Sequence, residues 1–210
     1  MSSTTLKRLS GLSLLAGSII VIAGIAPVLF VEPGPADPLS ASTALIRLIG
    51  AMLVVLGLPG VYPAEHRRMG ALGILGLLGT LLFFLMALAT EPIFAFVFPY
   101  LAVKDPGIVN GPPPAPLFIF FMIDGLMLLI GGTLLGIAIL RSAIPPRWSG
   151  LLLIIGALVS FAGNFFPGPI SDVGTVIFLF GLLWLTAGLW PKQAATAIAS
   201  SSVPPTSVRA

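Results

Sequence analysis

Long apolar segments alternate with short polar ones along most of the chain. A helix needs about 20 mainly apolar residues to cross the roughly 30 Å hydrocarbon core of a bilayer, at ~1.5 Å per residue. The segments that come close to this length are residues 11–31, 41–62, 70–90, 118–140, 150–166 and 173–190. The pattern predicts an all-α, polytopic membrane domain over residues 11–190, with six transmembrane helices.

Two polar segments flank this domain, a leader of residues 1–10 and a tail of residues 191–210. The tail consists mostly of Ala, Ser, Thr, Pro and Val without periodicity, which predicts disorder. A start of this kind is also compatible with a cleaved signal peptide. The apolar segment is longer than such peptides require, however, and its best cleavage site, Ala26, is followed by Pro27. We therefore expect this segment to be retained as the first helix.

The longest connection, residues 91–116, separates the third and fourth predicted helices. Its first half is apolar and aromatic but contains Pro92 and Pro99. This composition is typical of a segment that lies in the membrane interface or folds back over the bundle. The second half is rich in proline and glycine and is predicted to lack regular structure.

The composition of the chain agrees with a membrane protein, and the distribution of its basic residues predicts its orientation in the membrane. Of the 210 residues, 57% are hydrophobic and 8% charged, against roughly 25% charged residues in soluble domains. The basic residues are scattered between apolar spans, which argues against nucleic-acid binding. Lys7, Arg8, Arg67, Arg68, Arg141, Arg147, Lys192 and Arg209 lie on the side of the termini, and Lys104 lies opposite. This distribution predicts a multi-pass protein of the cell membrane with cytoplasmic N- and C-termini.

Glycines recur at matching positions in the predicted helices. The outward-running helices begin with Arg8, Gly11 and Gly17; with Arg67, Gly70 and Gly76; and with Arg147, Gly150 and Gly156. The returning helices contain the pairs Gly50 and Gly57, Gly125 and Gly132, and Gly174 and Gly181. The equal spacings predict three helical hairpin repeats. The alternative is chance, because glycine is common in membrane helices.

Two charged residues lie inside predicted helices at matching depth. Arg47 and Asp124 are each six residues from the outer start of their helix, or about 9 Å along it. An unpaired charge in hydrocarbon is costly, so their opposite signs predict an ion pair. Asp172 is expected to join Arg47 and Asp124 in one charge layer near the outer surface. Such a layer either holds helices in register or forms a substrate or ion site.

Several chemistries lack the residues they need. The chain has no cysteine, its sole histidine, His66, lies in a predicted cytoplasmic loop, and no predicted span contains a lysine or two acidic residues. Histidine-ligated haem or metal, a retinal Schiff base and a catalytic triad are therefore excluded from the spans. Asp124 and Asp172 on neighbouring helices remain open as an acidic pair. We predict no catalytic, metal or cofactor site.

Three strings resemble small uncharacterised six-helix membrane proteins of bacteria. They are RLSGL at the start of the first helix, PPRW before the fifth, and GLLWLTAGLW at the end of the sixth. The resemblance covers the membrane part of the chain. It implies no activity and no functional residues.

Two functions from different classes are expected. The first is a non-catalytic membrane subunit or a lipid- or apolar-ligand-binding protein, with the lipid bilayer and other membrane subunits as partners. The alternative is a small transporter or channel that uses the layer of Arg47, Asp124 and Asp172 as an external gate. Transporters commonly have broken helices and polar residues near mid-membrane, and the sequence contains few of either. An enzyme ranks third because the spans offer no evident base.

Overall fold

The computed structural model describes residues 3–31, 34, 37–60, 62–110, 114–142, 147–166 and 168–201. These residues form helices and no strand, which confirms the all-α prediction. The elements are α1 (Ser3–Phe30), α2 (Pro38–Gly57), the 3₁₀ turn η1 (Leu58–Gly60), α3 (Tyr62–Pro92), the π-helix η2 (Ile93–Val97), α4 (Phe98–Lys104), α5 (Pro106–Asn110), α6 (Ala115–Ser142), α7 (Arg147–Gly163) and α8 (Ile170–Ser201).

Five helical segments of the described chain are long and apolar enough to cross a membrane. They cover residues 8–30, 38–60, 69–104, 115–142 and 170–187. The remaining predicted span corresponds to α7, whose 17 residues extend about 25 Å. This helix ends at Gly163, before the predicted end at Phe166, because the chain turns there. Gly168 completes the turn with a φ of 85°, which other residues rarely adopt.

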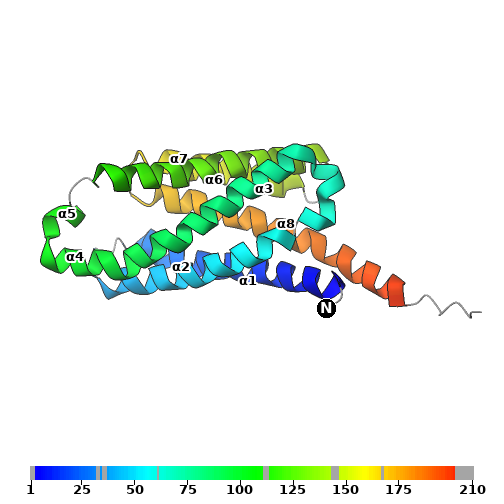
Figure 1. Ribbon diagram of the computed structural model, residues 1–210, viewed down its shortest axis with the longest axis horizontal. Coiled ribbons are helices and arrows are strands. Elements are labelled where there is room, and N and C mark those ends of the chain that lie inside the picture. The colour runs from blue at the N-terminus through cyan, green and yellow to red at the C-terminus, as the bar shows by residue number, and fades with distance from the viewer. Residues whose placement is uncertain are drawn as a thin grey trace, which may run out of the picture.

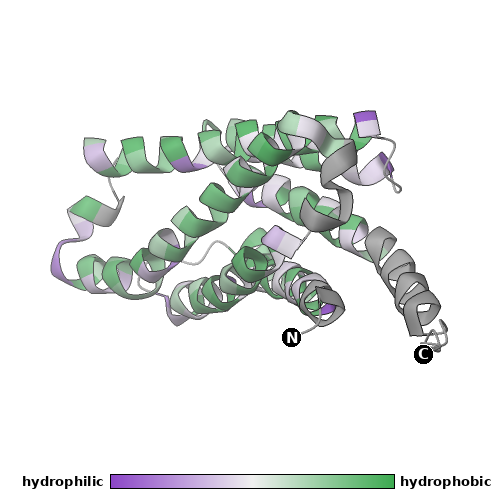
Figure 2. Cartoon of the chain, turned by 45° about the vertical axis from the view of Figure 1, so that its right-hand side comes forward, coloured by the Kyte–Doolittle hydropathy of each residue, from purple (hydrophilic) through white to green (hydrophobic). Residues whose placement is uncertain are grey.

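The long helices are apolar on their outer faces as well as inside. Figure 2 shows hydrophobic residues along their length and hydrophilic ones mainly near their ends and connections. Ile49, Leu75, Ile130, Leu158 and Phe180, from five different helices, are about half exposed. A helix that is apolar all round is typical of a membrane span, because lipid takes the place of water on its outer side.

The helices form a closed ring in chain order. Each of α1, α2, α3, α6, α7 and α8 packs against the next, and α8 returns to pack against α1. In Figure 1, α1 and α2 lie along one side and α6 and α7 along the other. Fully buried leucines fill the inside of the ring toward one end, among them Leu14, Leu58, Leu135, Leu153 and Leu182. The interior is therefore closed at that end. We call the other end, where α2, α6 and α8 begin, the pocket end.

Glycines allow close backbone contact in two of the helix pairs, and they do so in the same way. A Cβ atom on Gly17 of α1 would lie 2.7 Å from the carbonyl oxygen of Gly50 in α2. A Cβ atom on Gly156 of α7 would lie 2.8 Å from the carbonyl oxygen of Gly174 in α8. Small residues at such positions let helices pack by van der Waals contact, which is the main source of association in lipid.

The pair α3 and α6 uses Gly131 rather than Gly125, the glycine that the sequence spacing aligns with Gly50 and Gly174. Gly76 is opposite the backbone of Leu135, and Gly79 is opposite Gly131, with 2.7 Å between a Cβ on Gly79 and the Cα of Gly131. Gly131 thus takes the place that Gly50 and Gly174 have in the other pairs. Gly125 faces side-chain atoms of Phe161 on α7 and of Asn164 just after it. The difference of six residues moves α6 by about 9 Å along α3.

The connection after α3 is helical, where the sequence predicted an interfacial or folded-back segment. Helix α3 does not stop at Thr90, and residues 69–104 form one helical run of 36 residues through η2 and α4. Proline lacks an N–H and disrupts the interior of a helix. Pro92 instead directly precedes the π-helix, and Pro99 lies in the first turn of α4. The wider turn therefore accommodates both prolines without ending the run.

Three segments expected to be loop or disordered also have helical backbone. Residues 62–69 form the start of α3, ahead of a break at Gly70 (φ 60°, ψ −164°). Residues 106–110 form α5, and α8 continues through residues 191–201. The last of these is rich in alanine, the strongest helix former, which outweighs its lack of apolar periodicity. The side chains of residues 61–68 and all of residues 202–210 lie outside the described residues, as do Met1 and Ser2 of the leader.

Candidate functional site

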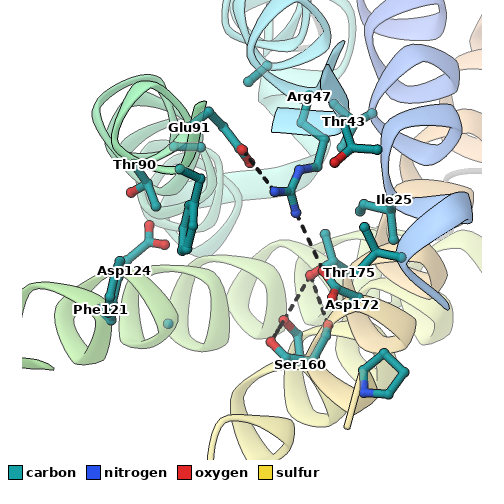
Figure 3. Close-up of a pocket in the computed structure, with 18 of the residues that line it drawn as sticks. Ile25, Thr43, Arg47, Thr90, Glu91, Phe121, Asp124, Ser160, Asp172 and Thr175 are labelled. Carbon is teal, nitrogen blue, oxygen red and sulfur yellow. Dashed lines mark hydrogen bonds and ion pairs between the residues drawn. The ribbon is translucent and has the colours of Figure 1, made fainter. Parts of the chain in front are cut away.

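A pocket of about 630 Å³ opens between the six ring helices at the pocket end. Every helix of the ring contributes to it, so the pocket is a product of ring closure and not of any single hairpin. Its polar lining residues are Ser40, Thr43, Arg47, Thr90, Glu91, Asp124, Ser160, Asn164, Ser171, Asp172 and Thr175. The three residues of the predicted charge layer are all among them. Figure 3 shows labelled members of this set on five helices: Arg47 on α2, Glu91 on α3, Asp124 on α6, Ser160 on α7 and Asp172 on α8.

Arg47 of α2 links three helices through ion pairs. Its Nη2 atom is 3.1 Å from Oε2 of Glu91 on α3, and its Nη1 atom is 3.8 Å from Oδ1 of Asp172 on α8. The side chains of Arg47 and Glu91 are only 18% and 14% exposed. The first pair is close in distance but not aligned as a hydrogen bond, since Oε2 of Glu91 has no hydrogen-bond partner among the described residues. Arg47 therefore acts as a shared positive charge between two carboxylates.

A glycine of α1 makes room for the arginine. A Cβ atom on Gly24 would lie 2.7 Å from Cγ of Arg47. Because Gly24 has no side chain, the aliphatic part of the Arg47 side chain can pass close to α1 while its guanidinium points into the ring. In α7, Gly163 has the corresponding position opposite Ser171 of α8.

Asp124 does not pair with Arg47, and that prediction is wrong. Figure 3 shows it on the wall formed by α3 and α6, away from the contact between Arg47 and Asp172. The register of α3 against α6 explains the difference. Arg47 lies three residues before Gly50, whereas Asp124 lies seven before Gly131, so Asp124 is one helical turn, about 6 Å, nearer the pocket end.

The carboxylate of Asp124 is left with an unsatisfied oxygen. Its Oδ1 atom is buried and has no hydrogen-bond partner among the described residues. Buried polar atoms are nearly always hydrogen-bonded, because an unpaired one loses its hydration without compensation. Arg47 and Glu91 also have such an atom, but unlike them and Asp172, Asp124 takes no part in the ion pairs around Arg47.

Hydroxyl groups of α7 and α8 form the wall opposite Asp124. Oγ of Ser160 is 3.0 Å from Oγ1 of Thr175 and 3.4 Å from Oγ of Ser171. Thr175 donates its hydrogen to the carbonyl oxygen of Ser171 at 3.0 Å, so Ser160 is the donor to Thr175. The amide nitrogen of Asn164 donates to the carbonyl oxygen of Ser160 at 3.2 Å. Hydrogen bonds among these side chains and the backbone thus satisfy the hydroxyl groups without a ligand.

Four phenylalanines form an apolar surface beside Asp124, here called the phenylalanine wall: Phe83, Phe84, Phe94 and Phe121. Phe94 and Phe121 stack with ring centres 5.9 Å apart and an angle of 14° between their planes. Phe94 belongs to η2. Phe121 precedes Asp124 by three residues, so Phe121 and Asp124 lie on one face of α6. The carboxylate and the aromatic rings therefore border the same part of the pocket.

Sequence reasoning missed Glu91 and the phenylalanine wall. Glu91 directly follows the predicted end of the third span at Thr90, so it was assigned to the outer connection. The signal that could have placed it in the bundle is the apolar string IFAFVF two residues later. That string continues the helix, so Glu91 faces the ring.

The pocket combines one guanidinium, three carboxylates, hydroxyls and aromatic rings. No group of three or more metal-ligating side chains within bonding range of one ion occurs in the described part of the chain. The titratable lining groups are three carboxylates and one arginine, which lies within ion-pair distance of two of them. Comparisons of the chain with protein-family models, with curated protein sequences and with solved structures find no match.

Proposed function

We propose that this chain is a multi-pass membrane protein that binds a small amphipathic ligand or lipid in the pocket, without catalysing a reaction. The observation that carries the proposal is a pocket of about 630 Å³ with an aromatic wall on one side and polar groups on the other. Volumes of roughly 300–1,000 Å³ with mainly apolar lining and a few polar groups are typical of small-molecule sites.

The same proposal includes six spans, with α7 as a short sixth, and cytoplasmic termini. It is supported by the alternating direction of the helices in the ring and by the basic residues near the ends of the chain. Reporter fusions after Arg68, Lys104 and Arg147 are expected to read inside, outside and inside. Alkaline phosphatase and fluorescent-protein activities in matched fusions measure this. A cytoplasmic reading at Lys104 would contradict the six-span topology.

We also propose that the three helix pairs are repeats of one hairpin. The equal glycine contacts of the α1–α2 and α7–α8 pairs support this, as does the corresponding position of Gly131 in the α3–α6 pair. We include in this proposal the resemblance to small uncharacterised six-helix membrane proteins of bacteria. If the resemblance holds, such proteins are expected to share this spacing of glycines.

The binding function can be tested by filling the pocket. Ala87 lines it, and Ala89 on the same helix is exposed on the outer face. Ala87→Trp is expected to weaken binding of 4-phenylbutan-1-ol by at least about tenfold, because the indole would occupy the space beside the phenylalanine wall. Ala89→Trp adds the same group outside the pocket and should bind like the parent.

Isothermal titration in lipid nanodiscs, corrected with empty nanodiscs, measures both affinities. Folding of each variant is checked by its free energy of unfolding. Binding that is equal in parent, Ala87→Trp and Ala89→Trp would mean that the alcohol enters the lipid only, and the proposed function would be wrong.

One observation favours the transporter as a second candidate. The π-helix η2 lies within the run from α3 to α4, next to the pocket, and supplies Phe94 to its lining. Single π-helical turns inside α-helices occur frequently at functional sites. A transporter would add movement of the ligand across the membrane to the binding described above.

A further inference from the structure

The balance of charge in the pocket points to the kind of ligand that fits. Arg47, Glu91, Asp124 and Asp172 are its charged lining residues. With all four ionised, three negative charges and one positive charge leave a net charge of two negative. Arg47 lies between Glu91 and Asp172, so these three residues together keep one negative charge. Asp124 carries the other and has no ion pair with Arg47.

The positive charge of Arg47 is already shared between two carboxylates. Its Nη2 atom lies 3.1 Å from Glu91 and its Nη1 atom 3.8 Å from Asp172. An added anion would also meet Asp124 at close range. Like charges in a poorly solvated site repel strongly, so the pocket disfavours carboxylates and phosphates.

A cation finds two complementary surfaces at one place. The carboxylate of Asp124, which lines the pocket and has no ion pair with Arg47, can accept a charge-assisted hydrogen bond, which is stronger than a neutral one. Phe121 lies one turn before Asp124 and stacks with Phe94. Aromatic faces attract cations within about 6 Å of the ring centre, and more strongly where water is excluded.

We propose that the pocket binds an alkylammonium compound with an apolar body. The ammonium group lies beside Asp124, and the apolar part lies along the phenylalanine wall toward Val21 and Ala51, deeper in the pocket. This inference rests on the proposed function and specifies the ligand's charge. Lipids with anionic headgroups are excluded by it.

The test compares three probes that share one skeleton: 4-phenylbutylamine, 4-phenylbutan-1-ol and 4-phenylbutyrate. At pH 7 they are cationic, neutral and anionic, since primary amines have pKa values near that of lysine, about 10.4. In nanodiscs made of neutral lipid, the parent protein is expected to bind the amine at least about tenfold more tightly than the alcohol. The carboxylate should bind more weakly than either.

Two matched variants locate the effect. Asp124→Asn and Asp172→Asn change the net charge equally, but Asp172 lies within ion-pair distance of Arg47 and Asp124 does not. Asp124→Asn is expected to abolish the preference for the amine, so that the amine and the alcohol bind this variant with similar affinity. Asp172→Asn should keep most of the preference. Asp124→Glu, which retains the charge, should keep part of it.

The outcomes separate the two proposals. Alcohol binding that depends on Ala87, without any preference for the amine in the parent, would overturn the inference and leave the proposed function standing. Equal loss of preference in Asp124→Asn and Asp172→Asn would show a general attraction of cations and overturn the assignment to Asp124. Absence of Ala87-dependent binding of any probe would overturn both. The comparison of probes on the parent needs no variant to fold.

Discussion

Arg47→Leu is expected to lower the free energy of unfolding by about 3 kcal/mol. The change leaves Glu91 and Asp172 as neighbouring carboxylates in a site where the Glu91 side chain is 14% exposed. Removing one member of a buried ion pair typically costs ~3–5 kcal/mol because the remaining charge loses its partner, and partial exposure here places the cost at the lower end. Unfolding in mixed micelles with increasing dodecyl sulfate measures the loss.

A double-mutant cycle then identifies the partner of Arg47. Glu91→Leu combined with Arg47→Leu should be considerably more stable than the sum of the two single changes predicts, because both charges leave together. Asp124→Leu combined with Arg47→Leu should be additive within about 0.5 kcal/mol. Coupling of Arg47 to Asp124 that exceeds its coupling to Glu91 would contradict the arrangement in the structure.

Gly131→Ala is expected to destabilise the protein by ~2–3 kcal/mol. Its added methyl group would meet the backbone of Gly79 and Thr80, at 2.8 Å from the Cα of Gly79. Backbone cannot move aside as a side chain can, so α3 and α6 would have to separate. The free energy of unfolding in the same micelles measures the effect.

Gly125→Ala is the matched control on the same helix. Its methyl group would lie 3.2 Å from the ring of Phe161 and 3.3 Å from the amide nitrogen of Asn164. Both are ends of flexible side chains, so the expected loss is below about 1 kcal/mol. A larger loss at Gly125 than at Gly131 would indicate that α3 and α6 pair in the register that the glycine spacing of the sequence suggests.

The helical class could be predicted from the sequence because membrane spans follow from local apolar length. Arg47, Asp124 and Asp172 all line one pocket, but Asp124 lies one helical turn nearer the pocket end than the equal depth expected from the sequence. The partner of Arg47 could not be predicted from the sequence, because it depends on the register of α6 against α3. Several glycines on one helix allow more than one such register. Glu91 was missed because a proline after an acidic residue ordinarily ends a helix, whereas a π-helix continues this one.

The uneven lengths of the ring helices have a consequence for the surrounding bilayer. The run over residues 69–104 is 36 residues long, or about 54 Å, whereas the 17 residues of α7 extend about 25 Å. Part of the longer run is taken up by its slope across the bundle in Figure 1. In the six-span arrangement proposed above, lipids beside α7 would meet a span shorter than the average hydrocarbon thickness and would compress, while those beside α3 and α4 would be stretched. Hydrophobic mismatch would then differ around the helix ring. The protein would favour a thinner bilayer beside α7 and lipids with longer acyl chains beside α3 and α4.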